Sequence, residues 1–234
     1  MMAESVRAFV AFTIDPEARR RIAPLLDHLR RGPAAKSLKC VSPENLHMTV
    51  RFFGDLDRKR LKRARAAVEA LDGGWEMPRV ELGELGAFPS MRRPSVFWLG
   101  LVDPGERVAT LARMIDLTIR KSGFGAADKR FVPHVTIARC RRGRSVPDPE
   151  RLTAGLTLPR GPLTIPTITL YQSDLRPEGP VYTPLQIARP RPGPDRPGVE
   201  RPDDPTSLPP RARRTGQDPA EPKEGEPSNG GHTR

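Results

Sequence analysis

One pattern occurs twice in the chain, in Leu46-His47-Met48-Thr49-Val50 and in Pro133-His134-Val135-Thr136-Ile137. Each copy has the form His-x-Thr-aliphatic within a stretch typical of a β-strand. Alternate residues of a strand point to the same face, so each histidine projects beside its threonine, about 6.5 Å away, while the residues between them face a core. The pattern therefore predicts two strands, each with one polar face and one buried face.

The segments around the two copies alternate between strand-like and helix-like patterns. We expect strands over residues 7–14, 46–53, 80–88, 95–102, 132–138, 163–173 and 181–188. Apolar residues recur at helical spacing over residues 17–31, 58–71 and 106–121, and a short helix is expected over 151–156. Antiparallel neighbours joined by short turns predict an α+β fold, with helices covering one face of each sheet.

Composition divides the chain at Ala188. The 234 residues carry a formal net charge of +12 and 28 prolines. Beyond residue 188 the apolar side chains are only those of Val199, Leu208, Ala212 and Ala220, which cannot form a core. We predict one domain over residues 1–188 and a disordered Pro/Arg/Gly-rich tail over residues 189–234.

Neither a secretory signal nor a membrane span is expected. The apolar run near the N-terminus is short and leads directly into Asp15 and Pro16. Cys40 and Cys140 are not part of a CxxC or Cys/His cluster, which argues against a zinc site or a disulfide framework. We therefore expect a cytoplasmic protein with two reduced thiols and with no metal or other cofactor.

Two histidines and two threonines without metal ligands suit acid–base chemistry at phosphorus. A free imidazole titrates near pH 6.5, about where one ring can be neutral and the other protonated, as general base and general acid require. Threonine hydroxyls donate to anionic oxygens without adding charge. These groups fit in-line displacement on a strained cyclic phosphodiester. The residues alone leave open which histidine is the acid.

Several strings of the chain resemble the 2H phosphoesterase superfamily, in its RNA 2′,3′-cyclic phosphodiesterase (2′-5′ RNA ligase) branch. They are the two His-x-Thr-x motifs, Phe97-Trp98-Leu99-Gly100, Arg130-Phe131-Val132, Leu170-Tyr171-Gln172-Ser173 and Tyr182-Thr183-Pro184-Leu185. Together they span most of residues 6–188. The resemblance implies a bilobal fold of two pseudo-symmetric lobes of antiparallel sheet, with helices on the outer faces and a central groove.

The resemblance also implies a reaction and roles for the residues. The reaction is hydrolysis of a 2′,3′-cyclic phosphate to a 2′-phosphate, with His47 as proton donor and His134 as proton acceptor. Thr49 and Thr136 would bind the phosphate, and Arg130 would add a contact to the phosphate or to the RNA backbone. Ligation to a 2′-5′ linkage would be the reverse reaction.

Positive charge indicates the kind of partner. Arg139, Arg141, Arg142 and Arg144 form a basic run after the second motif, which would attract a nucleic-acid strand. We expect a monomer that acts on RNA ends with a 2′,3′-cyclic phosphate, or on small cyclic nucleotides, and that does not bind membranes. Two alternatives stay open: a different substrate, such as another nucleotide-derived cyclic phosphate or a 2′-5′ linkage, and a non-catalytic basic RNA-binding module.

Aromatic residues near the motifs are assigned to packing. Phe131 precedes the second motif and is expected in the core, because a chain with 5% aromatic residues needs most of them there. Tyr171 and Tyr182 are expected to have structural roles in the last pair of strands. His28 lacks a threonine two positions later and is expected at the surface of its helix.

Overall fold

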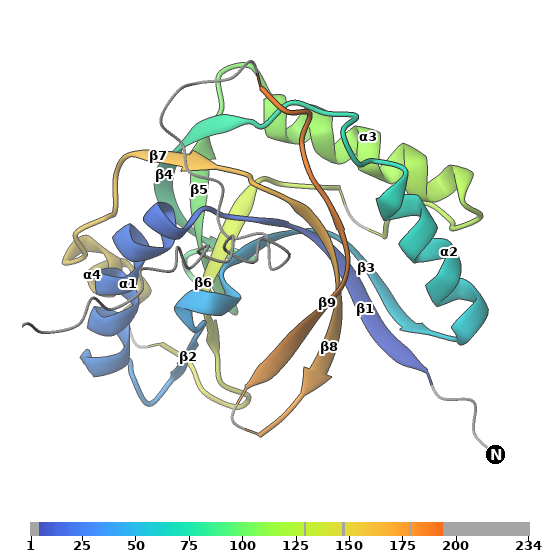
Figure 1. Ribbon diagram of the computed structural model, residues 1–234. Helices are drawn as coiled ribbons and strands as arrows, with labels where there is room; N and C mark the ends of the chain where they lie inside the picture. Colours follow the sequence, from blue (N-terminus) through green and yellow to red (C-terminus); the bar gives the residue numbers. More distant parts are fainter. Residues whose placement is uncertain (1–4, 129, 147, 178, 194–234) are drawn as a thin grey trace, which may run out of the picture. The chain divides into compact units, whose positions relative to one another are not determined.

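Two antiparallel sheets make up the computed structural model, which describes residues 5–128, 130–146, 148–177 and 179–193 (Figure 1). The first sheet has the strand order β3-β1-β8-β9 and the second has the order β2-β6-β5-β4-β7. The strands are β1 (Val6–Thr13), β2 (Leu38–Cys40), β3 (His47–Leu56), β4 (Arg79–Phe88), β5 (Val96–Val102), β6 (His134–Cys140), β7 (Pro162–Thr164), β8 (Ile168–Leu175) and β9 (Pro180–Ala188). The predicted α+β class is confirmed.

The helices pack on both sheets. They are α1 (Pro16–Arg31), α2 (Arg58–Glu69), α3 (Arg107–Lys121) and α4 (Pro149–Ala154), with a 3-10 turn over Pro43–Asn45. Helices α2 and α3 contact strands of the first sheet, and α1 contacts β2 and β7 of the second. The first sheet takes its strands from both ends of the described chain and the second mainly from its middle, so the two lobes are interleaved rather than successive halves.

Helix α1 begins where Asp15 ties it to the second sheet. One carboxylate oxygen of Asp15 accepts a hydrogen bond from the backbone N–H of Ala18 (2.8 Å), which caps the helix. The other accepts from the backbone N–H of Thr164 on β7 (2.6 Å). The buried face of the helix consists of Ala18, Ile22, Leu25, Leu26 and Leu29, as its spacing predicts.

One predicted strand was wrong and one strand was not predicted. The segment 163–173 forms two strands, β7 and β8, which belong to different sheets. Pro166 lies between them and has no backbone N–H to continue a ladder. Strand β2 has only three residues, too few to show a periodicity.

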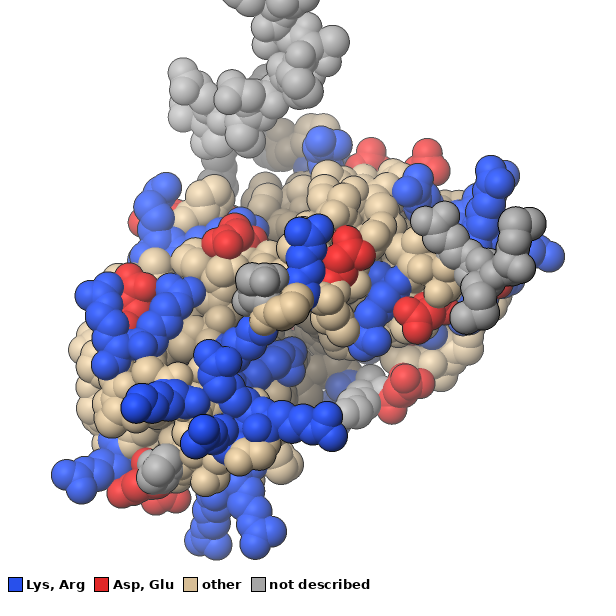
Figure 2. Space-filling view, turned by 90° about the horizontal axis from the view of Figure 1, so that it is seen from below, with Lys and Arg blue, Asp and Glu red and all other residues tan. Residues whose placement is uncertain are grey.

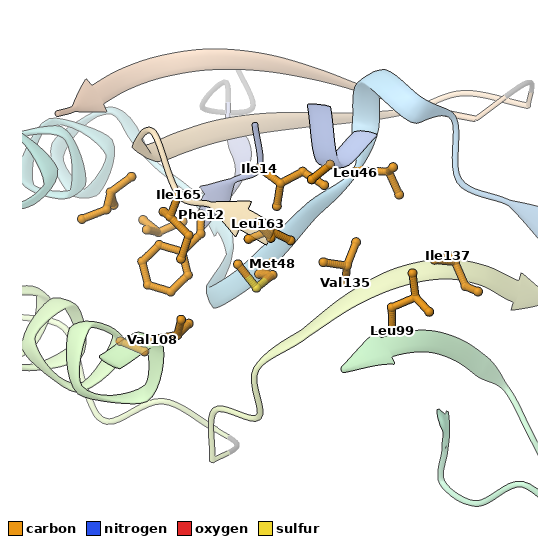
Figure 3. Packing of buried hydrophobic residues seen from close by; sticks show 14 of the residues in the cluster. Phe12, Ile14, Leu46, Met48, Leu99, Val108, Val135, Ile137, Leu163 and Ile165 are labelled. Atoms are coloured by element: carbon orange, nitrogen blue, oxygen red, sulfur yellow. The ribbon is translucent and has the colours of Figure 1, made fainter. Parts of the chain in front are cut away.

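The residues that alternate with the motif histidines and threonines lie in the core. Met48 and Val135 are both fully buried, and Figure 3 shows them in one apolar cluster with Phe12 and Leu163. Because neighbours in a strand point to opposite faces, this packing places His47 and His134 on the faces away from the cluster. The two-sided strands that the sequence predicts are thus present.

Backbone packing continues slightly past Ala188. The backbone N–H of Arg189 donates to Asp72 (2.6 Å), and that of Arg191 donates to the carbonyl of Trp75 (2.7 Å). The remainder of the predicted tail, residues 194–234, lies outside the described residues. Among the helices that are described, none combines the length and apolar character that a bilayer crossing requires.

Candidate active site

The two motif strands bring their histidines together. Strand β3 of the first sheet contacts strand β6 of the second. The two imidazoles are close enough that positive charge on His134 lowers the pKa of His47. Thr49 lies within the first motif with its hydroxyl 3.0 Å from Nε2 of His47, and Thr136 occupies the matching position on β6. Four of the five predicted site residues therefore belong to these two adjoining strands.

Each imidazole is held by a hydrogen bond to the backbone two residues earlier. Nδ1 of His47 donates to the carbonyl of Asn45, and Nδ1 of His134 donates to the carbonyl of Val132, both at 2.7 Å. A carbonyl oxygen can only accept, so the proton of each neutral ring is on Nδ1. Nε2 is then the nitrogen that takes or gives a proton in both motifs.

A β-bulge follows the threonine in each motif. Val50 is the extra residue where β3 pairs with β1, and Ile137 is the extra residue where β6 pairs with β5. Each bulge shifts the alternation by one residue, so the residue five positions after the histidine turns to the histidine's face. That residue is Phe52 in the first motif, with 59% of its surface exposed, and Arg139 in the second.

Burial and positive charge act on both imidazoles. Burial is the main cause that lowers the pKa of both rings, and the charge of Arg139 also lowers the pKa of both. With the charges of His134 and of Arg19 on α1 included, the pKa of His47 is about 4. Both rings are therefore neutral near pH 7 in the free protein, whereas the sequence suggested one neutral and one protonated ring. A bound phosphate would favour the protonated forms again, because opposite charges stabilise each other.

Aromatic rings flank the two histidines differently. The ring of His47 has its centroid 5.1 Å from that of Phe9 and 5.3 Å from that of Tyr182. The ring of His134 lies 5.0 Å from Phe88 and 6.0 Å from Trp98. Tyr182, which the sequence assigned to structure, thus contacts a candidate catalytic ring.

Arg139 rather than Arg130 is the arginine whose charge acts on both imidazoles. Arg130 is exposed in the loop before β6. The sequence placed Arg139 in a basic run and not in the site, because simple alternation would put Ala138 on the histidine's face. The available signal was the adjacent apolar pair Ile137 and Ala138, which breaks the alternation.

Two other expectations can be compared with the structure. Phe131 packs against the apolar core, edge-on to Phe12 at 6.0 Å, as expected. His28 is exposed on α1, also as expected.

The reverse face of β3 is fixed by Arg51, which is buried and donates to Asp116 of α3 (2.6 Å) and to the carbonyl of Gly125. The first motif is thereby anchored from behind.

Comparisons with known proteins identify the class. The family described as LigT like Phosphoesterase matches residues 12–98. An RNA 2′,3′-cyclic phosphodiesterase of Methanothermobacter thermautotrophicus is 33% identical, covering 79% of this chain and 98% of that protein. A protein of the same name from Archaeoglobus fulgidus is 31% identical, covering 78% of this chain and 99% of that protein.

Solved structures show the same fold. TT0787 of Thermus thermophilus has a TM-score of 0.63 and 25% identity, covering 79% of this chain and 98% of that one. Escherichia coli LigT without ligand has a TM-score of 0.61 and 24% identity, covering 80% of this chain and 98% of that one. The two interleaved sheets, with one motif strand from each, are thus the fold of a 2H phosphoesterase. The chain belongs to the LigT-like 2H phosphoesterase family.

Proposed function

We propose that this protein hydrolyses 2′,3′-cyclic phosphate ends of RNA, or small 2′,3′-cyclic nucleotides, to 2′-phosphomonoesters by general acid–base catalysis. The observation that carries the proposal is the matched pair of imidazoles, each with its proton held on Nδ1 and its Nε2 left for proton transfer. The names of the relatives in Methanothermobacter and Archaeoglobus support the same substrate.

The reaction needs one proton acceptor and one proton donor. Nε2 of His134 takes a proton from water as the water oxygen attacks phosphorus. The 3′-oxygen departs on the opposite side and receives a proton from Nε2 of His47, which leaves a 2′-phosphate. Ligation is the same step with a 5′-hydroxyl in place of water, rather than the reverse of the hydrolysis: His134 takes the proton of the 5′-hydroxyl, His47 protonates the departing 3′-oxygen, and a 2′-5′ linkage forms. Cleavage of that linkage back to the cyclic phosphate exchanges the two roles.

The environments of the rings support this order of roles. His47 is the more enclosed imidazole, and its pKa falls to about 4. A ring with a lower pKa is the stronger acid once it is protonated, whereas the ring with the higher pKa is the stronger base. The resemblance noted in the sequence gives the same order, with His47 as donor and His134 as acceptor.

The substrate supplies the charge that makes His47 an acid. In the free protein the ring is neutral, and the hydroxyl of Thr49 donates to its Nε2 (3.0 Å). An anionic phosphodiester raises the pKa of a nearby imidazole, so substrate binding is coupled to proton uptake. The hydroxyl of Thr49 is then released to donate to a phosphate oxygen.

Thr49, Thr136 and Arg139 form the proposed phosphate-binding set. Hydroxyl and guanidinium donors stabilise charge on the non-bridging oxygens in the transition state. Arg139 joins this set because its charge already reaches both imidazoles. We place Arg130 further out, as a contact to the RNA backbone from its exposed loop.

A basic surface supports RNA as the natural substrate. In the view from below, many Lys and Arg side chains gather on one part of the molecule (Figure 2). Where β2 pairs with β6, Lys39 lies opposite Arg139 on the neighbouring strand. Arg30, Lys39 and Arg141 are among the residues that line a hollow at this edge of the sheet. Clustered cations bind a phosphate backbone by releasing its counterions. We propose that residues 1–188 carry the whole reaction and that this edge holds the RNA strand behind its reactive end.

Phosphorus NMR tests the proposal directly. The full-length protein in the presence of a chelator should convert adenosine 2′,3′-cyclic phosphate to the 2′-phosphate alone. His47→Ala and His134→Ala should each lower turnover about 10²-fold or more, as loss of a general acid or base does. Leu117→Ala, which shortens an exposed apolar side chain on α3, is the control and should retain full turnover. A strict need for a divalent metal, or unchanged turnover in both histidine variants, would refute the proposal.

The same assay separates the alternatives. A protein that opens other nucleotide-derived cyclic phosphates but not the 2′,3′-cyclic nucleotide would keep the chemistry and change the substrate. A basic RNA-binding module would bind RNA with steep salt dependence and give no product with any cyclic phosphate.

A further inference from the structure

An aromatic pair lies beside His134 on the second sheet. The centroid of the Trp98 ring system is 6.0 Å from that of His134, the Phe88 ring is 5.0 Å from His134, and the two aromatic rings are 5.2 Å apart. Trp98 on β5 pairs directly with Thr136 on β6, so the two side chains project from the same face of the sheet. Both Phe88 and Trp98 are partly exposed. The pair therefore belongs to the face that carries the second motif.

Two glycines make room for the indole. A Cβ atom at Gly86 would lie 2.2 Å from two carbons of the Trp98 ring, and a Cβ atom at Gly100 would lie 3.3 Å from another. Neither glycine has a φ in the left-handed region, so the backbone does not require glycine at these positions. The ring itself requires them, because it lies along the sheet over the space that a side chain at residue 86 would fill.

The other tryptophan of the chain has a different environment. Trp75 is 4% exposed and belongs to the apolar core, where it contributes to packing. Trp98 instead lies partly open to solvent beside a proton-transfer group. A flat, partly open indole is a surface on which a nucleobase can stack.

The chemistry of the reaction indicates which nucleoside has its base near Trp98 and Phe88. In the proposed reaction the attacking oxygen enters beside His134 and the departing oxygen leaves beside His47. Both ester oxygens of a cyclic phosphate belong to one ribose, so its nucleoside lies on the His47 side, where Phe52 and Tyr182 are. A water molecule that attacks phosphorus has no base and gains nothing from an aromatic surface. A nucleoside whose 5′-hydroxyl attacks phosphorus has a base that needs a surface on which to stack.

We propose that Trp98 and Phe88 bind the base of a second nucleoside, on the His134 side of the phosphate. This inference rests on the proposed function and deepens it by naming the residues that bind the nucleoside on the His134 side of a 2′-5′ linkage.

Nearby charge fits the same occupant. Val96 pairs with Phe88 on one side and with Arg139 on the other, so this cation shares the face of the aromatic pair. Arg92 and Arg93 are exposed in the turn that directly follows Phe88 and Pro89. A strand that continues beyond the second nucleoside would meet these cations with its next phosphate.

Two matched ligands test the second subsite. One is the 2′-5′-linked dimer of 3′-deoxyadenosine, which lacks the hydroxyl needed to form a cyclic phosphate. The other is 3′-deoxyadenosine 2′-(methyl phosphate), which has the same charge and a methyl group in place of the second nucleoside. Calorimetry with the full-length protein should show about tenfold tighter binding of the dimer, the effect of one stacked base. The dimer should also quench tryptophan fluorescence.

Variants assign this preference to the aromatic pair. Trp98→Leu should lose most of the tenfold preference, and Gly86→Ala should reduce it by displacing the indole. Trp98→Phe should abolish the quenching, because Trp75 is buried. Leu117→Ala should keep both effects. Equal binding of the two ligands by the unaltered protein, or an intact preference in a folded Trp98→Leu variant, would overturn the inference.

The proposed function has a separate readout. Its failure would appear as absence of hydrolysis of adenosine 2′,3′-cyclic phosphate, whichever way the two ligands bind. Hydrolysis together with equal binding of the two ligands would remove only the second subsite. Circular dichroism and thermal melting of each variant establish that it is folded.

Discussion

The two motif strands are alike where the backbone sets the geometry and differ where the surroundings do. In both, Nδ1 of the histidine donates to the carbonyl two residues earlier, and a bulge follows the threonine. After the bulge the first strand presents Phe52 and the second presents Arg139. The shared part holds the two imidazoles in the same way. The difference places an aromatic ring beside the first histidine and a cation beside the second.

Burial adds a second difference between the strands. His47 is enclosed by Phe9 and Tyr182, and its Nε2 already accepts a hydrogen bond from Thr49. Among the described residues, the second motif does not form the equivalent hydrogen bond between Thr136 and Nε2 of His134. In the proposed mechanism the enclosed ring is the acid and the more open ring is the base, so that two similar motifs have different roles.

The largest expected effect separates acid from base by changing the leaving group. In a nucleoside 2′-(4-nitrophenyl phosphate) the 3′-hydroxyl attacks phosphorus from the His47 side, and the nitrophenolate leaves on the His134 side without needing a proton, so His47 is the base and the acid His134 becomes dispensable. His134→Ala should lose about 10²-fold or more on the cyclic phosphate but less than about tenfold on this ester. His47→Ala should lose about 10²-fold or more on both. Initial rates on the two substrates measure the contrast, and an equal loss for His134→Ala on both would reject the assigned roles.

The next effect compares two arginines near the second motif. Arg139→Gln should lower kcat/KM by about 10–100-fold, the loss of one or two charge-assisted hydrogen bonds to phosphate. Arg130→Gln removes the same charge from the loop before β6 and serves as the matched control, with a loss of about threefold or less. Arg139→Lys should recover part of the activity. A larger loss for Arg130→Gln would return the phosphate contact to the residue that the sequence first indicated.

These two arginines also show the limits of sequence-based prediction here. Both histidines, both threonines and the α+β class follow from period-two alternation and from the doubled motif. The position of Arg139 on the histidine's face does not follow from the alternation, because a bulge at Ile137 reverses it. That bulge depends on how β6 pairs with β5. Pairing between distant strands is a tertiary property, and the local sequence shows it only as two adjacent apolar residues.

The electrostatics could not be predicted for the same reason. The lowered pKa of His47 arises from burial and from the charges of Arg139, His134 and Arg19, which come from other parts of the chain. The pairing of both motif strands with their neighbours is likewise absent from the local pattern. Sequence predicts which groups are present, whereas tertiary packing sets their protonation.

A smaller effect is expected at Phe52, the counterpart of Arg139 on the first strand. Phe52→Leu should raise KM for adenosine 2′,3′-cyclic phosphate about tenfold, because a stacked base contributes that much to binding. The variant should not change KM for ribose 2′,3′-cyclic phosphate, which has no base to stack. Leu175→Ala, an exposed apolar residue at the end of β8, is the control. Equal effects of Phe52→Leu on both substrates would show that the ring supports the strand rather than the base.

The smallest effect concerns stability and compares the two histidines directly. The pKa of His47 is about 4 in the folded protein and near 6.5 in an unfolded chain, so between these values the unfolded chain binds the additional proton. The free energy of unfolding therefore falls as the pH drops from 7 to 5. Between pH 7 and pH 5 the unscreened shift would lower the free energy of unfolding by about 2 kcal/mol, and about 1 kcal/mol is expected because the ring keeps some contact with water. His134 contributes in the same direction, but less, because it is the more open ring. Urea unfolding at pH 7 and pH 5 measures this decrease in the free energy of unfolding. The decrease should be smaller in His47→Gln than in His134→Gln. A smaller decrease in His134→Gln would mean that the second motif strand holds the more enclosed histidine.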